Sequence, residues 1–170
     1  KPYMERLSDI SGEAVHLVQR EGNNILYIYK IEAKVGTIRM VSHVGMVHPV
    51  YCSGVGKAIM ATLPEKEVKQ IWNESIIEKK TDKTITDIDE MMQVLEEVRK
   101  NGYALDDEEN EEGVRCIAAC LHGYSKEVKY AFSISGPVSR MTRERVEELA
   151  VDVKKVQEEL SRELGYYPQN

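Results

Sequence analysis

The chain has 170 residues, of which 42% are hydrophobic and 31% are charged, and its formal net charge is −6. This length suits one domain with a sizeable core, whereas the acidic balance is unsuited to a surface that grips nucleic-acid phosphates. No apolar run approaches the ~20 residues that cross a bilayer, and no secretory signal is present. We therefore expect a cytoplasmic protein whose chain contacts neither DNA nor a membrane.

A short helix is predicted at the start of the chain, followed by a β-hairpin. The helix is indicated by apolar residues at helical spacing: Met4, Leu7 and Ile10. It ends at Gly12, a residue type that is common just past helix ends. The hairpin is indicated by β-rich runs at 14–20 and 25–32, which flank a turn cluster at 21–24.

The second strand of this hairpin alternates in a way that predicts one shared apolar face. By the period of two, that face carries Ile25, Tyr27, Tyr29 and Ile31. A third short strand is predicted at 37–41, and Pro49 then interrupts the β pattern. Hairpins of this kind favour an antiparallel sheet.

Three helices are predicted in the middle of the chain. The first spans 53–61, and the second begins at Pro64, a residue that suits the first helical position. The third is long, is capped by Thr86 and ends at Gly102. Its apolar residues recur at helical spacing: Ile88, Met91, Met92, Leu95 and Val98.

The stretch 102–137 carries the residues that most suggest a binding site. Two apolar runs, 114–121 and 128–134, predict neighbouring strands joined by a turn. Small side chains share one face of each strand: Val114, Cys116, Ala118 and Cys120 on the first, Ser133 and Ser135 on the second. With the acidic stretch 106–109 beside them, they offer room and hydrogen-bonding groups for a small polar molecule. The same residues are also compatible with close helix packing and with local backbone hydrogen bonds.

A final helix is predicted from a cap at Thr142 to Gly165. Its apolar stripe consists of Val146, Leu149, Val153, Leu160 and Leu164. The order of elements predicts the α+β class: an antiparallel sheet with helices packed on it, in a single domain over residues 1–170. Part of the stripe is also compatible with a dimer seam.

The glycines at the start of the helix at 53–61 resemble a phosphate-binding loop without meeting its requirements. A P-loop needs a glycine where Tyr51 stands and a Ser or Thr where Ala58 stands. The weaker interpretation is that free amides at this helix start, around Gly54 and Gly56, hold a carboxylate. The alternative is that these glycines only let the helix pack tightly on the sheet.

Neither a metal site nor a catalytic site is expected. The four candidate ligands, His43, His48, Cys52 and Cys116, lack the spacing of known zinc sites. Asp106 and Asp107 are adjacent on a strand, point to opposite faces and cannot pair as acid and base. The acidic run 108–112 is interpreted as a solvated loop. The three cysteines of the chain, Cys52, Cys116 and Cys120, are expected to be reduced, buried thiols.

Four segments resemble, in order and spacing, the effector-binding domain of the IclR-type family of bacterial transcriptional regulators. They are 11–17, 53–58, 102–119 and 133–137. The resemblance implies a GAF-like fold, dimers or tetramers, no cofactor, and small carboxylate ligands such as keto acids, sugar-derived acids or aromatic acids. It also implies an N-terminal winged helix-turn-helix domain, which is absent from this chain, as its start at Lys1 suggests. DNA would be bound only through that missing domain.

Carried over residue by residue, the resemblance implies an effector site made of Met40, Gly54, Val55, Asp106, Cys116, Ser133 and Ser135. Backbone amides near Gly54 and the serine hydroxyls would hold the carboxylate, and Asp106 would accept hydrogen bonds from ligand hydroxyls. Cys116 would pack on the carbon skeleton. Whether Asp106 or Asp107 faces the ligand stays open, and His48 departs from the apolar residue common in the family.

The resemblance therefore predicts a domain that senses a small carboxylate for a DNA-binding regulator, which represses or activates catabolic genes. The amino-acid sequence at 38–41 and 51–52 is most similar to that of the sugar-acid branch of the family, which includes regulators that respond to 2-keto-3-deoxygluconate. The alternatives are a stand-alone enzyme acting on a small organic acid and a dimerisation module without a ligand. The effector, the sign of regulation, the operator and the choice between dimer and tetramer stay open.

Overall fold

The computed structural model describes residues 1–36 and 40–169. Within them, six strands form one antiparallel sheet in the order β3-β2-β1-β6-β5-β4. The strands are β1 Ala14–Glu21, β2 Asn24–Ile31, β3 Val47–Pro49, β4 Ala104–Asp107, β5 Val114–Leu121 and β6 Tyr130–Pro137. Strands β1 and β6 lie side by side although they are distant in the sequence, so the first hairpin joins the later strands into a single sheet.

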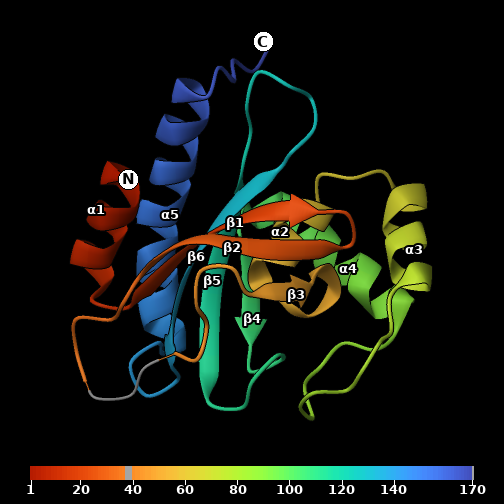
Figure 1. The fold of residues 1–170 in the computed structure, drawn as a ribbon, viewed down its shortest axis with the longest axis horizontal. Coiled ribbons are helices and arrows are strands. Elements are labelled where there is room, and N and C mark those ends of the chain that lie inside the picture. The colour runs from red at the N-terminus through yellow and green to blue at the C-terminus, as the bar shows by residue number, and fades with distance from the viewer. Residues whose placement is uncertain (37–39, 170) are drawn as a thin grey trace.

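Helices cover both faces of this sheet, as Figure 1 shows. They are α1 Pro2–Ser11, α2 Gly54–Met60, α3 Glu65–Glu74, α4 Ile88–Asn101 and α5 Arg143–Glu163, with a short 3₁₀ turn η1 at Val50–Cys52. The first and last helices, α1 and α5, share one face, while α2 packs on the other with α3 and α4 outside it. The predicted α+β class in one domain is confirmed.

Each face of the sheet has its own hydrophobic core. The core under α2 contains Tyr51, Ile59, Met60, Met91 and Leu95, all buried. The core under α1 and α5 contains Met4, Leu7, Phe132, Ile134 and Met141. Each such side chain contributes about 1.5–3 kcal/mol when it is fully buried. Because both faces are covered, β5 and β6 read in the sequence as continuous apolar runs rather than as alternating strands.

The helix ends follow local chemistry, with one difference from prediction. Gly12 and Gly102 end α1 and α4 in the left-handed conformation, with φ of 72° and 81°. Thr142 caps α5, its side chain accepting a hydrogen bond from the amide of Arg145. The predicted cap at Thr86 is wrong, because Asp87 occupies the cap position of α4 and its carboxylate accepts from the amide two residues on.

A β-bulge at Ile28 makes the predicted single face of β2 wrong. Tyr27 pairs with Val18 and Tyr29 pairs with Leu17, so one extra residue stands between neighbouring pairs. The extra residue inverts the alternation. Tyr27 consequently packs in the core under α2, whereas Tyr29 packs in the core under α1 and α5.

The predicted strand at 37–41 is replaced by a different edge strand. Residues 37–39 lie outside the described residues, and residues 40–41 are not in a strand. The strand that pairs with the outer side of β2, away from β1, is β3, and it includes Pro49, which we had interpreted as a break. Proline has no amide hydrogen to donate, so it is tolerated at an edge such as this.

Candidate ligand-binding cavity

Two rows of small and polar side chains cross the sheet on the face that α2 covers. In the first row, Ala14, Ser135, Cys116 and Asp106 are direct cross-strand partners on β1, β6, β5 and β4. The second row, two positions along each strand, consists of His16, Ser133, Ala118 and Ala104. The predicted shared faces of β5 and β6 are confirmed by this register. These side chains are too small to fill the layer between sheet and helix.

A cavity of about 100 Å³ lies on this floor. Its sides are the start of α2 and the residues that follow β4, and its roof is the segment 40–46, here called the cover segment. All seven residues of the expected effector site line it: Met40, Gly54, Val55, Asp106, Cys116, Ser133 and Ser135. The fold thus brings them together from five separate parts of the chain, while their role in binding stays a prediction.

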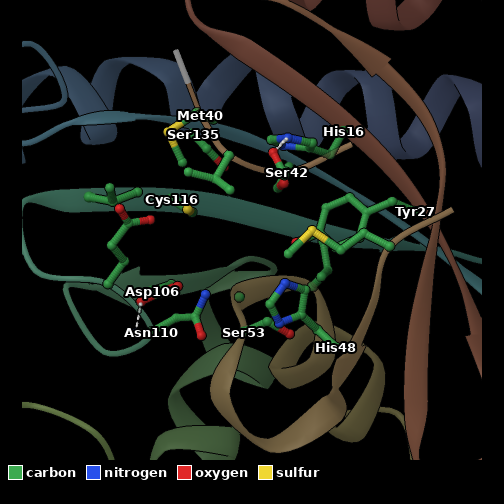
Figure 2. Close-up of a pocket in the computed structure, with 17 residues that line it drawn as sticks. His16, Tyr27, Met40, Ser42, His48, Ser53, Asp106, Asn110, Cys116 and Ser135 are labelled. Atoms are coloured by element: carbon green, nitrogen blue, oxygen red, sulfur yellow. Dashed lines mark hydrogen bonds between the residues drawn. The ribbon is translucent and has the colours of Figure 1, made fainter. Parts of the chain in front are cut away.

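Asp106 is nearly buried, with 5% of its surface exposed, and lies at one end of the first row (Figure 2). Its Oδ1 accepts hydrogen bonds from the amides of Glu109, at 2.9 Å, and Asn110, at 3.3 Å. Burial and the negative charge of Glu109 raise the pKa of Asp106 from its ordinary 3.8 to about 6, although these two amides and Lys57 oppose the rise.

Asp107 takes no part in the cavity. Its side chain leaves the opposite face of β4 and accepts a hydrogen bond from Arg115 Nε at 2.9 Å. It also lies near the ammonium of Lys83. The period of two on a strand separates the neighbouring carboxylates in this way, so Asp106 is the one that faces the cavity.

A buried ion pair supports the turn that carries Asp106. The ammonium of Lys57 lies 2.6 Å and 2.9 Å from the two carboxylate oxygens of Glu109. Glu109 Oε2 also accepts from the amide of Asp107 at 2.8 Å. The interpretation of 108–112 as a solvated loop is therefore wrong for Glu109. Its side chain is buried, and the buried ammonium of Lys57 neutralises its charge. The lysine of the phosphate-loop-like sequence binds a carboxylate of its own chain.

The two glycines of α2 serve different purposes. A Cβ at Gly56 would lie 1.8 Å from the carbonyl oxygen of Val50, so no other residue fits there. A Cβ at Gly54 would lie 3.4 Å from that of Ala118, which is an ordinary contact. Close packing thus accounts for Gly56, whose amide is already bonded to Ser53 Oγ at 3.0 Å. The amides of Gly54 and Val55 precede the first intrahelical bond, and within the described residues they have no recorded partner.

The cover segment is attached to the floor and to β2 by polar contacts. Lys30 Nζ donates to the carbonyl oxygens of Met40, at 3.1 Å, and Ser42, at 2.5 Å. Ser42 Oγ lies 2.7 Å from Nε2 of His16, a floor residue of β1 (Figure 2). Burial, with the positive charge of Lys30, lowers the pKa of His16 from 6.5 to about 4. His16 is therefore a neutral imidazole near pH 7.

Sequence reasoning missed several residues of the cavity. They are His16, Tyr27, Val41, Ser42, Met46, Ser53, Asn110 and Glu111. A signal was available only for His16, because it is a polar residue within the apolar run of β1. The rings of His16, Tyr27 and His48 meet edge to face, with centroid distances of 5.2 Å and 5.7 Å. His48, which was noted as a departure, lies at the cavity and is half-buried.

The three cysteines are free thiols. Burial raises the pKa of Cys52 and of Cys120 to about 11, and it raises that of Cys116 further. In the part of the chain that the structure describes, no three His, Cys, Asp or Glu side chains are grouped so that they could hold a metal ion. Among the described helices, none combines the length and the apolar character that a membrane span requires.

Comparisons with known proteins identify relatives along nearly the whole chain. Residues 1–162 match the family model described as "Bacterial transcriptional regulator IclR C-terminal". The chain is 35% identical over 164 residues to the HTH-type transcriptional regulator KdgR of Escherichia coli, covering 96% of this chain and 62% of that protein. It is also 35% identical over 168 residues to the HTH-type transcriptional repressor AllR of Klebsiella pneumoniae, covering 99% and 61%. The chain thus spans less than two thirds of these relatives.

Solved structures agree with the sequence relatives. The Thermotoga maritima IclR superposes with a TM-score of 0.91 at 37% identity, over 97% of this chain and 66% of that one. The C-terminal domain of Escherichia coli KdgR gives 0.86 at 33% identity, over 97% and 95%. These relatives are transcriptional regulators rather than enzymes, so the alternative of a stand-alone enzyme has no support.

Proposed function

The chain belongs to the C-terminal domain family of the IclR-type bacterial transcriptional regulators, and we propose that its cavity senses a small carboxylate on behalf of a DNA-binding regulator. The observation that carries this proposal is the convergence of unbonded helix-start amides, two serine hydroxyls and one buried carboxyl group on a single cavity. A cytoplasmic location, assembly into a dimer or tetramer, and DNA binding through a separate N-terminal domain are parts of the same proposal.

The polar groups of the cavity divide into hydrogen-bond donors and one carboxyl group, and both kinds suit a hydroxy or keto acid. The amides of Gly54 and Val55 with the hydroxyls of Ser133 and Ser135 are donors, which suits a carboxylate. Asp106 lies beside Gly54, where an added Cβ would be 3.6 Å from the Cβ of Asp106, and two strands away from Ser135. Its carboxyl group can accept hydrogen bonds from hydroxyl groups of the ligand. Apolar side chains, with Met40 in the roof, contact the carbon skeleton.

The size of the cavity favours a short acid. Its volume of about 100 Å³ is well below the roughly 300–1,000 Å³ of sites for drug-sized ligands. A two- to four-carbon keto acid suits such a space. A six-carbon sugar acid, such as 2-keto-3-deoxygluconate, is compatible with the likeness to KdgR, but it requires the cover segment to move outward.

The cover segment also suggests how binding is transmitted. It joins β2 to β3 and contacts the floor through Ser42, so a ligand beneath it changes the balance between its closed and open positions. A ligand that prefers one position biases the relative placement of subunits and thereby the spacing of the DNA-binding domains. Couplings of this kind are typically worth ~1–3 kcal/mol.

Two experiments test the proposal. Thermal unfolding of this chain is measured with a panel of keto acids and sugar acids, and at least one is expected to raise the midpoint. In the intact regulator, Asp106→Ala and Ser135→Ala are expected to abolish the response of a reporter gene to that acid. Asp82→Ala, at an exposed loop position, is the matched control. An unchanged response in both cavity variants contradicts the proposal.

The outcomes also separate the alternatives. A domain that serves only for dimerisation would show no stabilisation by any acid of the panel. An enzyme would convert a stabilising acid into a product, which is checked by following the acid itself over hours. The proposal requires stabilisation without turnover.

A further inference from the structure

The charges around the cavity pose a problem for an anionic ligand. The acidic side chains that line it are Asp106 and Glu111, and among the described lining residues there is no lysine or arginine. The ammonium of Lys57 acts on Asp106, but it is already held by Glu109 at 2.6 Å. A carboxylate that enters the cavity therefore meets a buried carboxyl group, with no cation between them among the residues that the structure describes.

The other titratable groups that line the cavity, within the part of the chain that the structure describes, supply no positive charge. Burial lowers the pKa values of His16 and His48, so both imidazoles are neutral near pH 7. Burial raises the pKa values of Tyr27, Cys52 and Cys116, so the phenol and the thiols are neutral as well. The charges of Lys30 and Lys80 act on His16 and His48, but neither lysine lines the cavity. Among the described residues that line it with Asp106, the titratable groups are therefore neutral or, as at Glu111, acidic.

Two carboxylates that share a buried site do not both stay ionised, because each disfavours the charge of the other. Resting on the proposed function, we propose that the cavity takes up one proton together with a monocarboxylic acid and holds this proton on Asp106. The site then gains no net charge when it fills. Proton and anion come from solution, and no other reactant is needed.

The hydrogen bonds of Asp106 indicate where the proton lies. Its Oδ1 already accepts from two backbone amides, those of Glu109 and Asn110. Its Oδ2 has no recorded partner within the described residues. The proton therefore resides on Oδ2 and is donated to an oxygen of the ligand. A protonated carboxyl group keeps some acceptor capacity, so it can still receive a bond from a ligand hydroxyl.

The empty cavity is already close to this state. Burial and Glu109 have raised the pKa of Asp106 to about 6 before any ligand enters. A second negative charge raises it further and in the same direction. Proton uptake near neutral pH is accordingly a small additional step.

The balance of charge in the cavity also restricts the class of ligand. One proton on Asp106 compensates one carboxylate, and nothing that lines the described cavity compensates a second. A dicarboxylate would place its second charge near Asp106 or Glu111. We therefore expect monocarboxylic 2-oxo acids to bind and dicarboxylates of similar size to be excluded.

Calorimetric titration tests the proposal directly. Pyruvate and 2-oxobutyrate are titrated into the chain at pH 7.5 in buffers of different ionisation enthalpy, with malonate as the dicarboxylate. The buffer dependence of the heat gives the number of protons taken up, expected to lie between about one half and one. The dissociation constant is expected to weaken by up to about tenfold from pH 7 to pH 8.

Asp106→Asn is the decisive variant, because its amide keeps the acceptor oxygen and carries hydrogens without titrating. It is expected to bind the same acids with no proton uptake and with an affinity that does not change over this pH range. If wild type binds pyruvate or 2-oxobutyrate without proton uptake, a cation from elsewhere compensates the acid and the proposal is wrong. Malonate binding as tightly as pyruvate also overturns it.

A second measurement needs no variant. Infrared difference spectra of wild type with and without pyruvate at pH 7.5 are expected to gain the carbonyl band of a protonated carboxyl group, and its absence overturns the proposal. If no acid binds at any pH, the proposed function itself fails. The two failures are therefore distinguishable.

Discussion

The carboxylate of Glu109 holds the ammonium of Lys57 at 2.6 Å inside the protein, although the two residues are 52 positions apart. The amide of Glu109 donates to Asp106, and its carboxylate accepts from the amide of Asp107. Glu109 thus connects α2 to the turn that shapes one side of the cavity. The ion pair is a structural support for that side rather than a part of its lining.

Removing one partner of this pair is expected to destabilise the fold strongly. Lys57→Met leaves the Glu109 carboxylate buried without a cation, which typically costs about 3–5 kcal/mol. Urea unfolding measures the loss. Lys69→Met is the matched control, because Lys69 and Glu65 form an exposed pair at the same 2.6 Å, worth less than ~1 kcal/mol. Equal losses in the two variants would contradict the role assigned to the buried pair.

The two glycines of α2 are expected to respond very differently to the same substitution. Gly56→Ala puts a methyl group 1.8 Å from the carbonyl oxygen of Val50, so the helix must shift, and we expect a loss of several kcal/mol or no folding. Gly54→Ala makes only ordinary contacts and is expected to change stability by less than ~1 kcal/mol. Thermal unfolding of both variants checks this, and a well-folded Gly56→Ala would show that the packing is looser than described.

The pH dependence of stability is expected to reflect two opposing groups. The pKa of Asp106 is raised from 3.8 to about 6, so the folded state binds the extra proton and stability falls as pH rises through this window. The pKa of His16 is lowered from 6.5 to about 4, so the unfolded state binds the extra proton and stability rises with pH. Each effect is equivalent to roughly 3 kcal/mol, and they largely cancel.

Variants separate these two effects. Asp106→Asn leaves only the His16 effect, so the free energy of unfolding should rise from pH 4 to pH 6.5 relative to wild type. His16→Gln leaves only the Asp106 effect and should show the opposite trend. Denaturant unfolding at several pH values measures both. Only differences from wild type are interpreted, because the other carboxylates titrate in all three proteins. Parallel profiles would contradict the two pKa displacements.

The hydrogen bond between Ser42 and His16 is expected to matter for ligand residence more than for folding. Ser42→Ala removes a contact of 2.7 Å between the cover segment and the floor, worth about 1 kcal/mol. An acid bound beneath the segment should dissociate several-fold faster, as measured by stopped-flow displacement. Ser125→Ala, at an exposed turn position, is the control. An unchanged dissociation rate would show that the segment does not retain the ligand.

Much of the architecture follows from local pattern. Helical spacing with the glycines at 12 and 102 predicted α1 and the end of α4, and the period of two predicted which residues of β5 and β6 share a face. These features depend on neighbours within a few positions along the chain, so one sequence suffices to infer them. The α+β class followed from their order. Cys116 and the two serines were singled out on the same basis, whereas Asp106 was specified by the family resemblance.

Tertiary contacts decided the rest. The bulge at Ile28 lies in the pairing of β1 with β2, and it turns half of β2 to the other core. Glu109 is buried because Lys57, distant in sequence, neutralises it. His16 and Ser42 join the cavity only when the cover segment folds back onto β1. Local sequence determines which backbone conformation and which face a residue prefers, whereas the charge and space around it depend on segments that meet only in the folded chain.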